Sequence, residues 1–336
     1  MAPSSRLLRL LFGVLLLSGV AACAPVTARV PVAVPAVEQA AVGQPAPAVQ
    51  QQAADVPAGR ILYVRDGNLW MWQAGASRQF SDGGTWYQPS FSPDGTEIAY
   101  VYWTFNFSDI FVMTSDGASA RRLTKGQAGN LMDSDWAFRP RWSPDGSQLA
   151  YVSDGGTRFP VVWLMNKDGS GRHQVMTSGY GVDWADALSW APDGKRIAVS
   201  AGPAVPSPDP GQIWLLDVGK GTAEKLTEHT SGAIDPAWAP TGDVIAYVGR
   251  TAPNGELWIR SLDGSKQAHL GGLPYIRGPA WSPDGKSLAV LAAKGGVFQV
   301  WTMTVTPTDT GFDIGEPRQL TRDGSLDASS GLTWAR

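Results

Sequence analysis

A five-residue segment, Trp-Ser-Pro-Asp-Gly, occurs at residues 142–146 and again at residues 281–285. Close variants stand at residues 91–95, 190–194 and 238–242. The leading aromatic residues of the five segments are 51, 48, 48 and 43 residues apart, and each segment precedes a short apolar run such as Ile-Ala-Tyr-Val. A regular spacing of this size predicts that the chain is built from structural repeats.

Each repeat contains four short strand patterns. The apolar run is followed by a strand with an aromatic residue at a fixed place, then by a turn that often contains Asp-Gly, and then by a short strand ending in Leu-Thr or a similar pair. The aromatic residues at the fixed place are Trp70, Phe111, Trp163, Trp214, Trp258 and Trp301. Four strands in a repeat of this length are typical of one blade of a β-propeller.

The two ends of the repeat region complement each other. Residues 61–64 match the second strand of a blade whose first strand is missing, and residues 332–336 match a first strand. Pairing them would close the ring and leave no open sheet edge. The sequence therefore predicts an all-β fold over residues 60–336. We expect a six-bladed β-propeller with four antiparallel strands per blade, its first blade closed by the C-terminal strand.

The Trp-Ser-Pro-Asp-Gly, Ile-Ala-Tyr, Ile-Trp and Leu-Thr elements resemble TolB-type propeller repeats, which form six-bladed rings in bacterial periplasmic proteins. The resemblance covers residues 60–336 and implies the fold, but not one function, because a common fold serves many functions. TolB itself is soluble and carries an α/β domain before its propeller. We expect neither feature here, and therefore a TolB-like protein that is not TolB.

The first 22 residues have the pattern of a bacterial signal peptide. Arg6 and Arg9 precede an apolar run, and small residues follow it. The sequence Val-Ala-Ala-Cys that ends at Cys23 resembles a lipobox, which implies cleavage before this cysteine and its lipidation. An ordinary signal peptide followed by a chance cysteine is the alternative. Residues 23–59 are rich in Ala and Pro and predict a disordered tether after the lipidated cysteine.

These features predict a lipoprotein anchored to a membrane on the extracytoplasmic side of a bacterial envelope, in the periplasm or at the cell surface. Cys23 is the single cysteine, so the chain cannot form an internal disulfide. The formal net charge is -3 and no basic block follows the N-terminus, which argues against nucleic acid as a partner. We expect a monomer without a cofactor.

The 15 tryptophans separate into repeat positions and exceptions. Those expected to pack between adjacent blades are Trp142, Trp190, Trp238, Trp281 and Trp334 on first strands, and Trp70, Trp163, Trp214, Trp258 and Trp301 on third strands; Trp72 shares a third strand. Trp86, Trp103, Trp136 and Trp184 remain. They stand between blades or just after a second strand, where the connections emerge on one face of the ring.

We predict a binding rim on this face, formed by aromatic residues and a few charges. It comprises Trp86, Tyr87, Trp103, Phe105, Trp136, Arg139, Tyr180, Trp184, Asp186, Asp235, Tyr275 and Arg277. Such a surface suits a protein, a peptide or an envelope glycan. Alternatively, these aromatic side chains plug the channel or pack the loops.

Patterns for catalysis or metal binding are lacking. The sequence contains no Gly-x-Ser-x-Gly and no His-Glu-x-x-His. Asp94, Asp145, Asp193 and Asp284 occupy repeated turn positions, which suits a structural role. The pairs Asp133/Asp135 and Asp183/Asp186 lack the spacing of a calcium loop. We therefore expect binding without catalysis and without a metal. A lyase or lactone hydrolase at the channel mouth, with or without the assistance of a metal, is the competing hypothesis, and an architectural envelope protein is a third.

Overall fold

The computed structural model describes residues 57–126, 134–155, 159–175, 183–203, 210–251, 255–322, 324 and 326–336. Residues Pro57–Arg336 form one compact unit. The predicted signal peptide, Cys23 and most of the predicted tether lie outside the described residues, and so do Asp133 and Tyr180.

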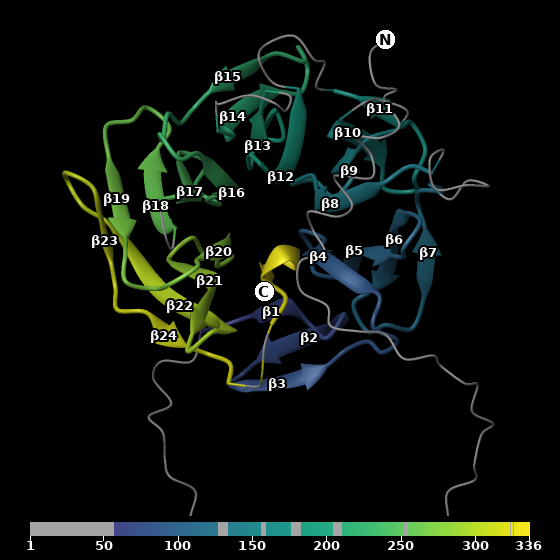
Figure 1. The fold of residues 1–336 in the computed structure, drawn as a ribbon, viewed down its shortest axis with the longest axis horizontal. Helices are drawn as coiled ribbons and strands as arrows, with labels where there is room; N and C mark the ends of the chain where they lie inside the picture. Colours follow the sequence, from purple (N-terminus) through teal and green to yellow (C-terminus); the bar gives the residue numbers. More distant parts are fainter. Residues whose placement is uncertain are drawn as a thin grey trace, which may run out of the picture. The chain divides into compact units, whose positions relative to one another are not determined.

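Six antiparallel sheets are arranged in a ring (Figure 1), so the predicted all-β, six-bladed propeller is confirmed. We call the region around the axis of this ring the channel. From the channel outward, the first three blades consist of β25 (Thr333–Ala335), β1 (Arg60–Arg65), β2 (Asn68–Gln73) and β3 (Ala76–Gln79); β4 (Trp86–Phe91), β5 (Glu97–Trp103), β6 (Ser108–Thr114) and β7 (Ala120–Arg122); and β8 (Ala137–Trp142), β9 (Gln148–Ser153), β10 (Val161–Asn166) and β11 (His173–Gln174).

The next three blades follow the same order. They consist of β12 (Trp184–Trp190), β13 (Arg196–Gly202), β14 (Gln212–Asp217) and β15 (Ala223–Lys225); β16 (Ala233–Trp238), β17 (Val244–Gly249), β18 (Glu256–Ser261) and β19 (Gln267–Leu270); and β20 (Arg277–Trp281), β21 (Ser287–Lys294), β22 (Val297–Pro307), β23 (Phe312–Ile314) and β24 (Arg318–Gln319).

The sixth blade differs from the predicted four-stranded pattern. Its β22 is long enough to pair with two short strands, β24 through Trp301 and Thr302 and β23 through residues 305–307. The extra strand β23 belongs to a hairpin whose Thr308 carbonyl accepts a hydrogen bond from Lys266 of the fifth blade. The remaining blades have four strands each.

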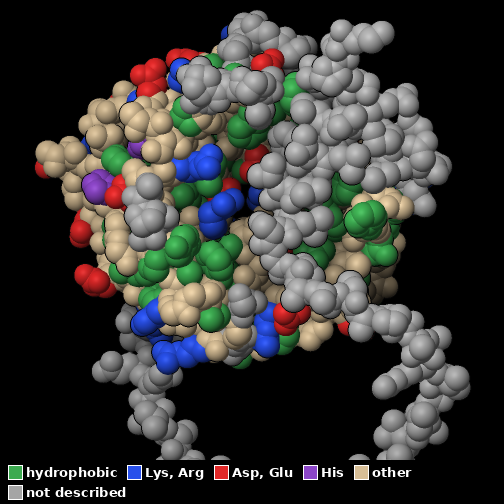
Figure 2. Space-filling view, viewed as in Figure 1, with side chains coloured by type: hydrophobic (Ala, Val, Ile, Leu, Met, Phe, Trp, Pro, Cys, Tyr) green, Lys and Arg blue, Asp and Glu red, His purple; other side chains and the backbone are tan. Residues whose placement is uncertain are grey.

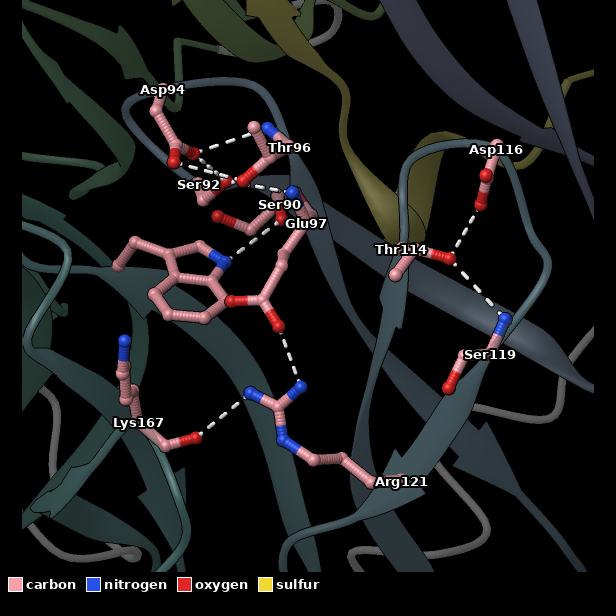
Figure 3. A network of polar contacts seen from close by, with 11 residues as sticks. Ser90, Ser92, Asp94, Thr96, Glu97, Thr114, Asp116, Ser119, Arg121 and Lys167 are labelled. Carbon is pink, nitrogen blue, oxygen red and sulfur yellow. Dashed lines mark hydrogen bonds and ion pairs between the residues drawn. The ribbon is translucent and has the colours of Figure 1, made fainter.

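Ser-Pro-Asp-Gly segments connect the first and second strands of their blades. In the second blade, Ser92 and Thr96 both donate hydrogen bonds to Asp94, and Gly95 has φ +69° (Figure 3). These bonds lower the pKa of Asp94 to about 2, the bond from Ser92 contributing most. Glycine suits this place because L side chains rarely adopt positive φ. Asp94 is therefore occupied by its own turn, as the structural interpretation of the repeated Asp predicts.

The hydrophobic core consists of clusters between adjacent blades, to which tryptophans of the first strands contribute. Their side chains are buried, and three donate their indole N–H to a main-chain carbonyl of the preceding blade's innermost strand: Trp142 to Ser90, Trp190 to Arg141 and Trp281 to Ala237. The third-strand tryptophans Trp163, Trp214, Trp258 and Trp301 belong to the same clusters. The predicted packing between blades is thus confirmed for these residues.

The Leu-Thr pairs fasten the outer strand of a blade to the third strand. Thr227 donates from Oγ1 to Oε1 of Gln212 at 2.8 Å, and the same hydroxyl accepts the N–H of Ile213 at 2.9 Å. The same arrangement joins Thr124 to Asp109 and Thr321 to Gln299. All three threonines are buried, so each hydroxyl satisfies polar groups that water does not reach.

The C-terminal strand closes the ring. β25 pairs with β1, placing Trp334 opposite Ile61. The indole N–H of Trp334 donates to the carbonyl of Ala58 at 2.9 Å, and Arg60 donates to the carbonyl of Arg336 at 3.0 Å. The two ends of the propeller are therefore joined both by a β-ladder and by side-chain hydrogen bonds.

Candidate functional site

The predicted rim residues gather on one face because of where they stand on their strands. Trp103 ends β5, Trp86 and Trp184 begin β4 and β12, and Trp136 precedes β8. In an antiparallel blade, the start of the first strand and the end of the second lie at the same edge. Figure 2 shows a central hollow with both basic and acidic side chains around it.

Three rim aromatics form a continuous run across the second and third blades. The ring centroids of Tyr87 and Trp103 are 6.4 Å apart, and those of Trp103 and Trp136 are 5.3 Å apart. The main-chain N–H of Trp136 donates to Asp154 at 2.8 Å, which fixes the end of this aromatic run. All three side chains are half-buried, and Phe105, in the loop after Trp103, is 81% exposed.

Trp86 and Trp184 pack against their own blades. The Trp86 ring lies 4.5 Å from that of Tyr100, and its indole N–H donates to the carbonyl of Asp82. The indole N–H of Trp184 donates to the carbonyl of Pro203 at 2.9 Å, and the ring covers Gly202 and Gly211 so closely that a Cβ at either would come within 3.3 Å of it. The alternative that some rim aromatics pack the loops therefore fits these two residues.

The innermost strands carry β-bulges, where the pairing register shifts. At the bulges stand Gln88, Arg139, Asp186, Asp235 and Gly278, which we call the channel ring. All except Asp186 have φ between +52° and +58°. The ring residues of most of these strands are followed by proline, which cannot donate a ladder hydrogen bond, and a bulge is the usual consequence.

Neighbouring members of the channel ring bind one another. The N–H of Arg139 donates to the side chain of Gln88 at 2.8 Å, and Nε of Arg139 pairs with Asp186 at 3.1 Å. On the other side, one oxygen of Asp235 accepts both Nε of Arg277 at 2.8 Å and the N–H of Gly278 at 3.0 Å. The structure thus brings four predicted rim residues together as two ion pairs that link adjacent blades.

Asp235 remains charged although it is buried. Burial by itself would raise its pKa, but the charges of Arg277 and Arg139 and the Gly278 N–H outweigh burial and lower the pKa. The charge of Asp235 in turn raises the pKa of Arg277, to which the more distant Asp186 and Asp327 also contribute. Charges from several blades therefore act on one another across the channel.

Arg141, which was not predicted as a site residue, also belongs to this charged region. It is half-buried on β8, and burial, followed by the like charge of Arg139, lowers its pKa to about 10, while Asp235 acts in the opposite direction. The guanidinium therefore stays protonated at neutral pH. The other repeats carry a small residue before the leading aromatic residue of the turn segment, and the third repeat carries Arg141 there. This difference was a sequence signal that could have identified Arg141.

The 3₁₀ helix η1 (Ala328–Ser330) is a second feature that sequence reasoning missed. It lies at the centre of the ring in Figure 1 and contacts β1, β4 and β20. Asp327 accepts the N–H of Ser329 at its N-terminus, and the Asp-x-Ser-Ser pattern was the available signal for this cap. Its contact with β4, which bears Tyr87, places η1 near the aromatic run. Burial, and then the charge of Asp327, raise the pKa of Tyr87.

A cleft of about 410 Å³ lies beside η1 between the fifth and sixth blades. Tyr275, Arg277, Phe298 and Ser329 line it together with Arg250 and other residues. Tyr275 is 53% exposed and has φ +56°. The predicted residues Tyr275 and Arg277 therefore belong to a hollow next to the channel mouth.

The histidines and carboxylates are arranged differently from a metal centre. Within the described ranges, no group of three His, Cys, Asp or Glu side chains could hold a metal ion. His229 packs between Tyr247 and Trp258 and contacts the Tyr247 hydroxyl at 3.0 Å.

The part of the chain that the structure describes contains no helix long and apolar enough to span a membrane.

Comparison with protein families identifies the repeats. Residues 73–204 match the PD40 family, described as the TolB beta propeller domain. The protein is a TolB-like six-bladed β-propeller. The crystal structure of TolB from Acinetobacter baumannii is similar to it with a TM-score of 0.64 and 22% identity, over 82% of this chain and 66% of that one.

Two further proteins are also similar to this TolB-like propeller. The uncharacterized peptidase YuxL of Bacillus subtilis is 32% identical over 85 residues, which are 25% of this chain and 13% of that protein's length. An oligogalacturonate lyase in complex with manganese has a TM-score of 0.52 and 17% identity, with 75% of each chain covered. The fold is thus shared by proteins named for quite different activities.

Proposed function

We propose that this TolB-like propeller is a binding protein without catalysis, which recognises a protein, a peptide or an envelope glycan through its aromatic rim. The observation that carries the proposal is the exposure of Phe105 and Tyr275. Among the described residues they are the exposed large hydrophobic side chains, and both stand in rim loops. Aromatic side chains of this kind are enriched where proteins bind partners.

The rigidity of the surrounding mouth supports the same proposal. The aromatic run of Tyr87, Trp103 and Trp136 is half-buried and held by ring contacts, and the channel ring is held by ion pairs between blades. A surface whose side chains are already ordered loses little conformational entropy on binding. The mouth therefore offers a preorganised floor, from which Phe105 and Tyr275 project.

The proposed location is the extracytoplasmic face of a bacterial membrane. The lipobox-like sequence ending at Cys23 and the Ala- and Pro-rich segment after it support a lipid anchor with a tether. We propose that the propeller acts there as a monomer. TolB of A. baumannii shares the fold, and TolB-like homologues are periplasmic, which supports this location.

Replacing Phe105 and Tyr275 together with Ala tests the proposed function. Because both side chains are exposed, the variant should keep the melting temperature of the wild type. Loss of two aromatic contacts should weaken partner binding by roughly 30-fold or more. The wild-type protein is first used to capture proteins and glycans from an envelope extract. Binding of these captured partners is then measured for both proteins. Arg78→Ala on the outer strand β3 is the control, and unchanged binding by the double variant would remove the support for this rim.

A further inference from the structure

Arg141 stands at a position where the other five blades carry small residues. The strand register aligns it with Ser90, Ser189, Ala237 and Ala280, because each of these pairs with the alanine of the following strand, and Thr333 takes the same place opposite Leu62. The strands that bear these residues are the innermost ones (Figure 1). One long cationic side chain therefore replaces the small residues that the other blades carry at this level of the ring.

The guanidinium of Arg141 has few polar partners among the described residues of the ring. The hydrogen bond of its guanidinium to a described residue goes to the carbonyl of the preceding Pro140, at 3.0 Å. Nearby carboxylates are already engaged, Asp186 by Arg139 and Asp235 by Arg277. Arg141 forms no ion pair with a residue in the described part of the chain. Holding a half-buried charge without a counterion costs free energy that Ser or Ala would not cost.

The surroundings restrict what can reach Arg141. Asp235 is 6% exposed and Arg139 is 6% exposed, although both stand on strands beside the channel. The charged side chains at this level of the channel, which we call the neck, are therefore packed against protein. A carboxylate on a thin, flexible stem fits such a neck better than a pyranose ring does, and a carboxylate matches the two parallel donors of a guanidinium.

From these observations we propose that Arg141 binds a carboxylate of an extended peptide segment that enters the channel from the aromatic rim. This inference rests on the proposed binding function and specifies its ligand class. The aromatic run and Phe105 contact the flanking residues of the segment, and Arg141 selects the acidic group. The carboxylate belongs to an Asp or Glu side chain or to the C-terminus of the partner.

The test uses the full chain, a matched pair of variants and four probes. Arg141→Ser introduces the residue that the second and fourth blades carry, and Arg78→Ser, on an exposed outer strand, is the control. The probes are the blocked peptide acetyl-Trp-Gly-Glu-Gly-Trp-amide, its Gln counterpart, the same Gln peptide with a free C-terminal carboxylate, and trigalacturonate. Binding is measured by calorimetry or by ligand-observed NMR.

We expect the Glu peptide or the free-carboxylate peptide to bind the wild type roughly tenfold more tightly than the blocked Gln peptide, because a charge-assisted pair replaces an amide contact. Arg141→Ser should abolish this preference and keep or raise the melting temperature, and Arg78→Ser should change neither. If the Glu peptide binds more tightly, Arg141 recognises an acidic side chain. If the free-carboxylate peptide binds more tightly, Arg141 recognises a chain terminus.

Several results would overturn the proposal. They are an undiminished preference in Arg141→Ser, a melting temperature lowered by several degrees, which would make Arg141 structural, and binding of trigalacturonate in place of the peptides. Equal binding of charged and neutral peptides would also reject Arg141 as a carboxylate-binding residue, while leaving the aromatic rim as a binding surface. If the Phe105/Tyr275 variant retained all partner binding, the proposed function itself would fail.

Discussion

At the scale of single residues, the turns are held by hydrogen bonds between neighbours in the chain. The channel residues are held instead by contacts between different blades. Asp145 is bonded to Ser143 and Ser147, both within two residues of it. Arg139 instead pairs with Asp186, 47 residues away, after a bulge has redirected its main chain. The first relation can be predicted from a pentapeptide, and the second requires the ring.

The turn of the third blade gives a pH-dependent prediction. Hydrogen bonds, that from Ser143 being the strongest, lower the pKa of Asp145 from 3.8 to about 2. The ionised form therefore stabilises the fold above about pH 4, and this stabilisation is lost as the pH falls through 2. Asp145→Asn should lower the melting temperature by about 2 °C at pH 7.

The difference between wild type and Asp145→Asn should shrink between pH 4 and pH 2, which thermal unfolding followed by circular dichroism would measure. Glu224→Gln, on the exposed outer strand β15, is the control. A difference that stays constant down to pH 2 would show that the ionised carboxylate does not contribute as described.

At the scale of strands, the Leu-Thr pair has a function that its sequence pattern did not reveal. The pattern predicts the end of a short outer strand. The structure adds that the buried hydroxyl joins that strand to the third strand of its blade, in the same way at Thr124, Thr227 and Thr321. The partner residue lies 14 to 22 residues earlier in the chain, so its identity follows from strand pairing and not from the Leu-Thr pair itself.

Thr227→Val tests this connection. The valine fills the same volume but leaves the N–H of Ile213 without its partner in a buried site. It also removes one hydrogen bond of the Gln212 side chain, which stays bonded to the main chain of His229. The free energy of unfolding should fall by about 1–3 kcal/mol. Denaturant unfolding measures it, with Thr222→Val on the exposed surface as the control. Equal stability of the two variants would contradict the role assigned to the hydroxyl.

At the scale of the whole molecule, the two ends of the propeller close the ring, because β25 pairs with β1. Deleting residues 331–336 removes β25 and leaves the edge of β1 and the surface of the first blade exposed. We expect a lower melting temperature and aggregation, because an open strand edge can pair with another chain. Light scattering and calorimetry measure both, and deletion of Arg336 alone is the control. A truncated protein that stays monodisperse with an unchanged melting temperature would refute the closure.

The proposed lipid anchor also concerns the whole molecule. If Cys23 is lipidated, the full chain should fractionate with membranes, and Cys23→Ser should release it, because the acyl chains supply the affinity for the bilayer. Cell fractionation and the mass of the purified N-terminus check this outcome. A wild-type protein that is recovered without acyl chains would favour an ordinary signal peptide.

The sequence by itself determined the propeller, the number of blades and the strand that closes the ring. Turn chemistry, strand alternation and the repeat period are all carried by residues close together in the chain, so they can be read without a structure. It also placed Tyr87, Trp103, Trp136, Arg139, Asp235 and Arg277 on one face, because strand ends alternate regularly between the two faces. The role of these residues in binding remains a prediction.

The tertiary structure alone decided which of these residues lie against one another. It packed Trp86 and Trp184 onto their own blades, paired Arg139 with Asp186 and Arg277 with Asp235, placed η1 at the centre of the ring, and left Arg141 without a carboxylate partner among the described residues. Most of these relations join residues on different blades or far apart in the chain. Local patterns mark some of the positions, such as the prolines at the β-bulges, but only the closure of the ring brings the partners together.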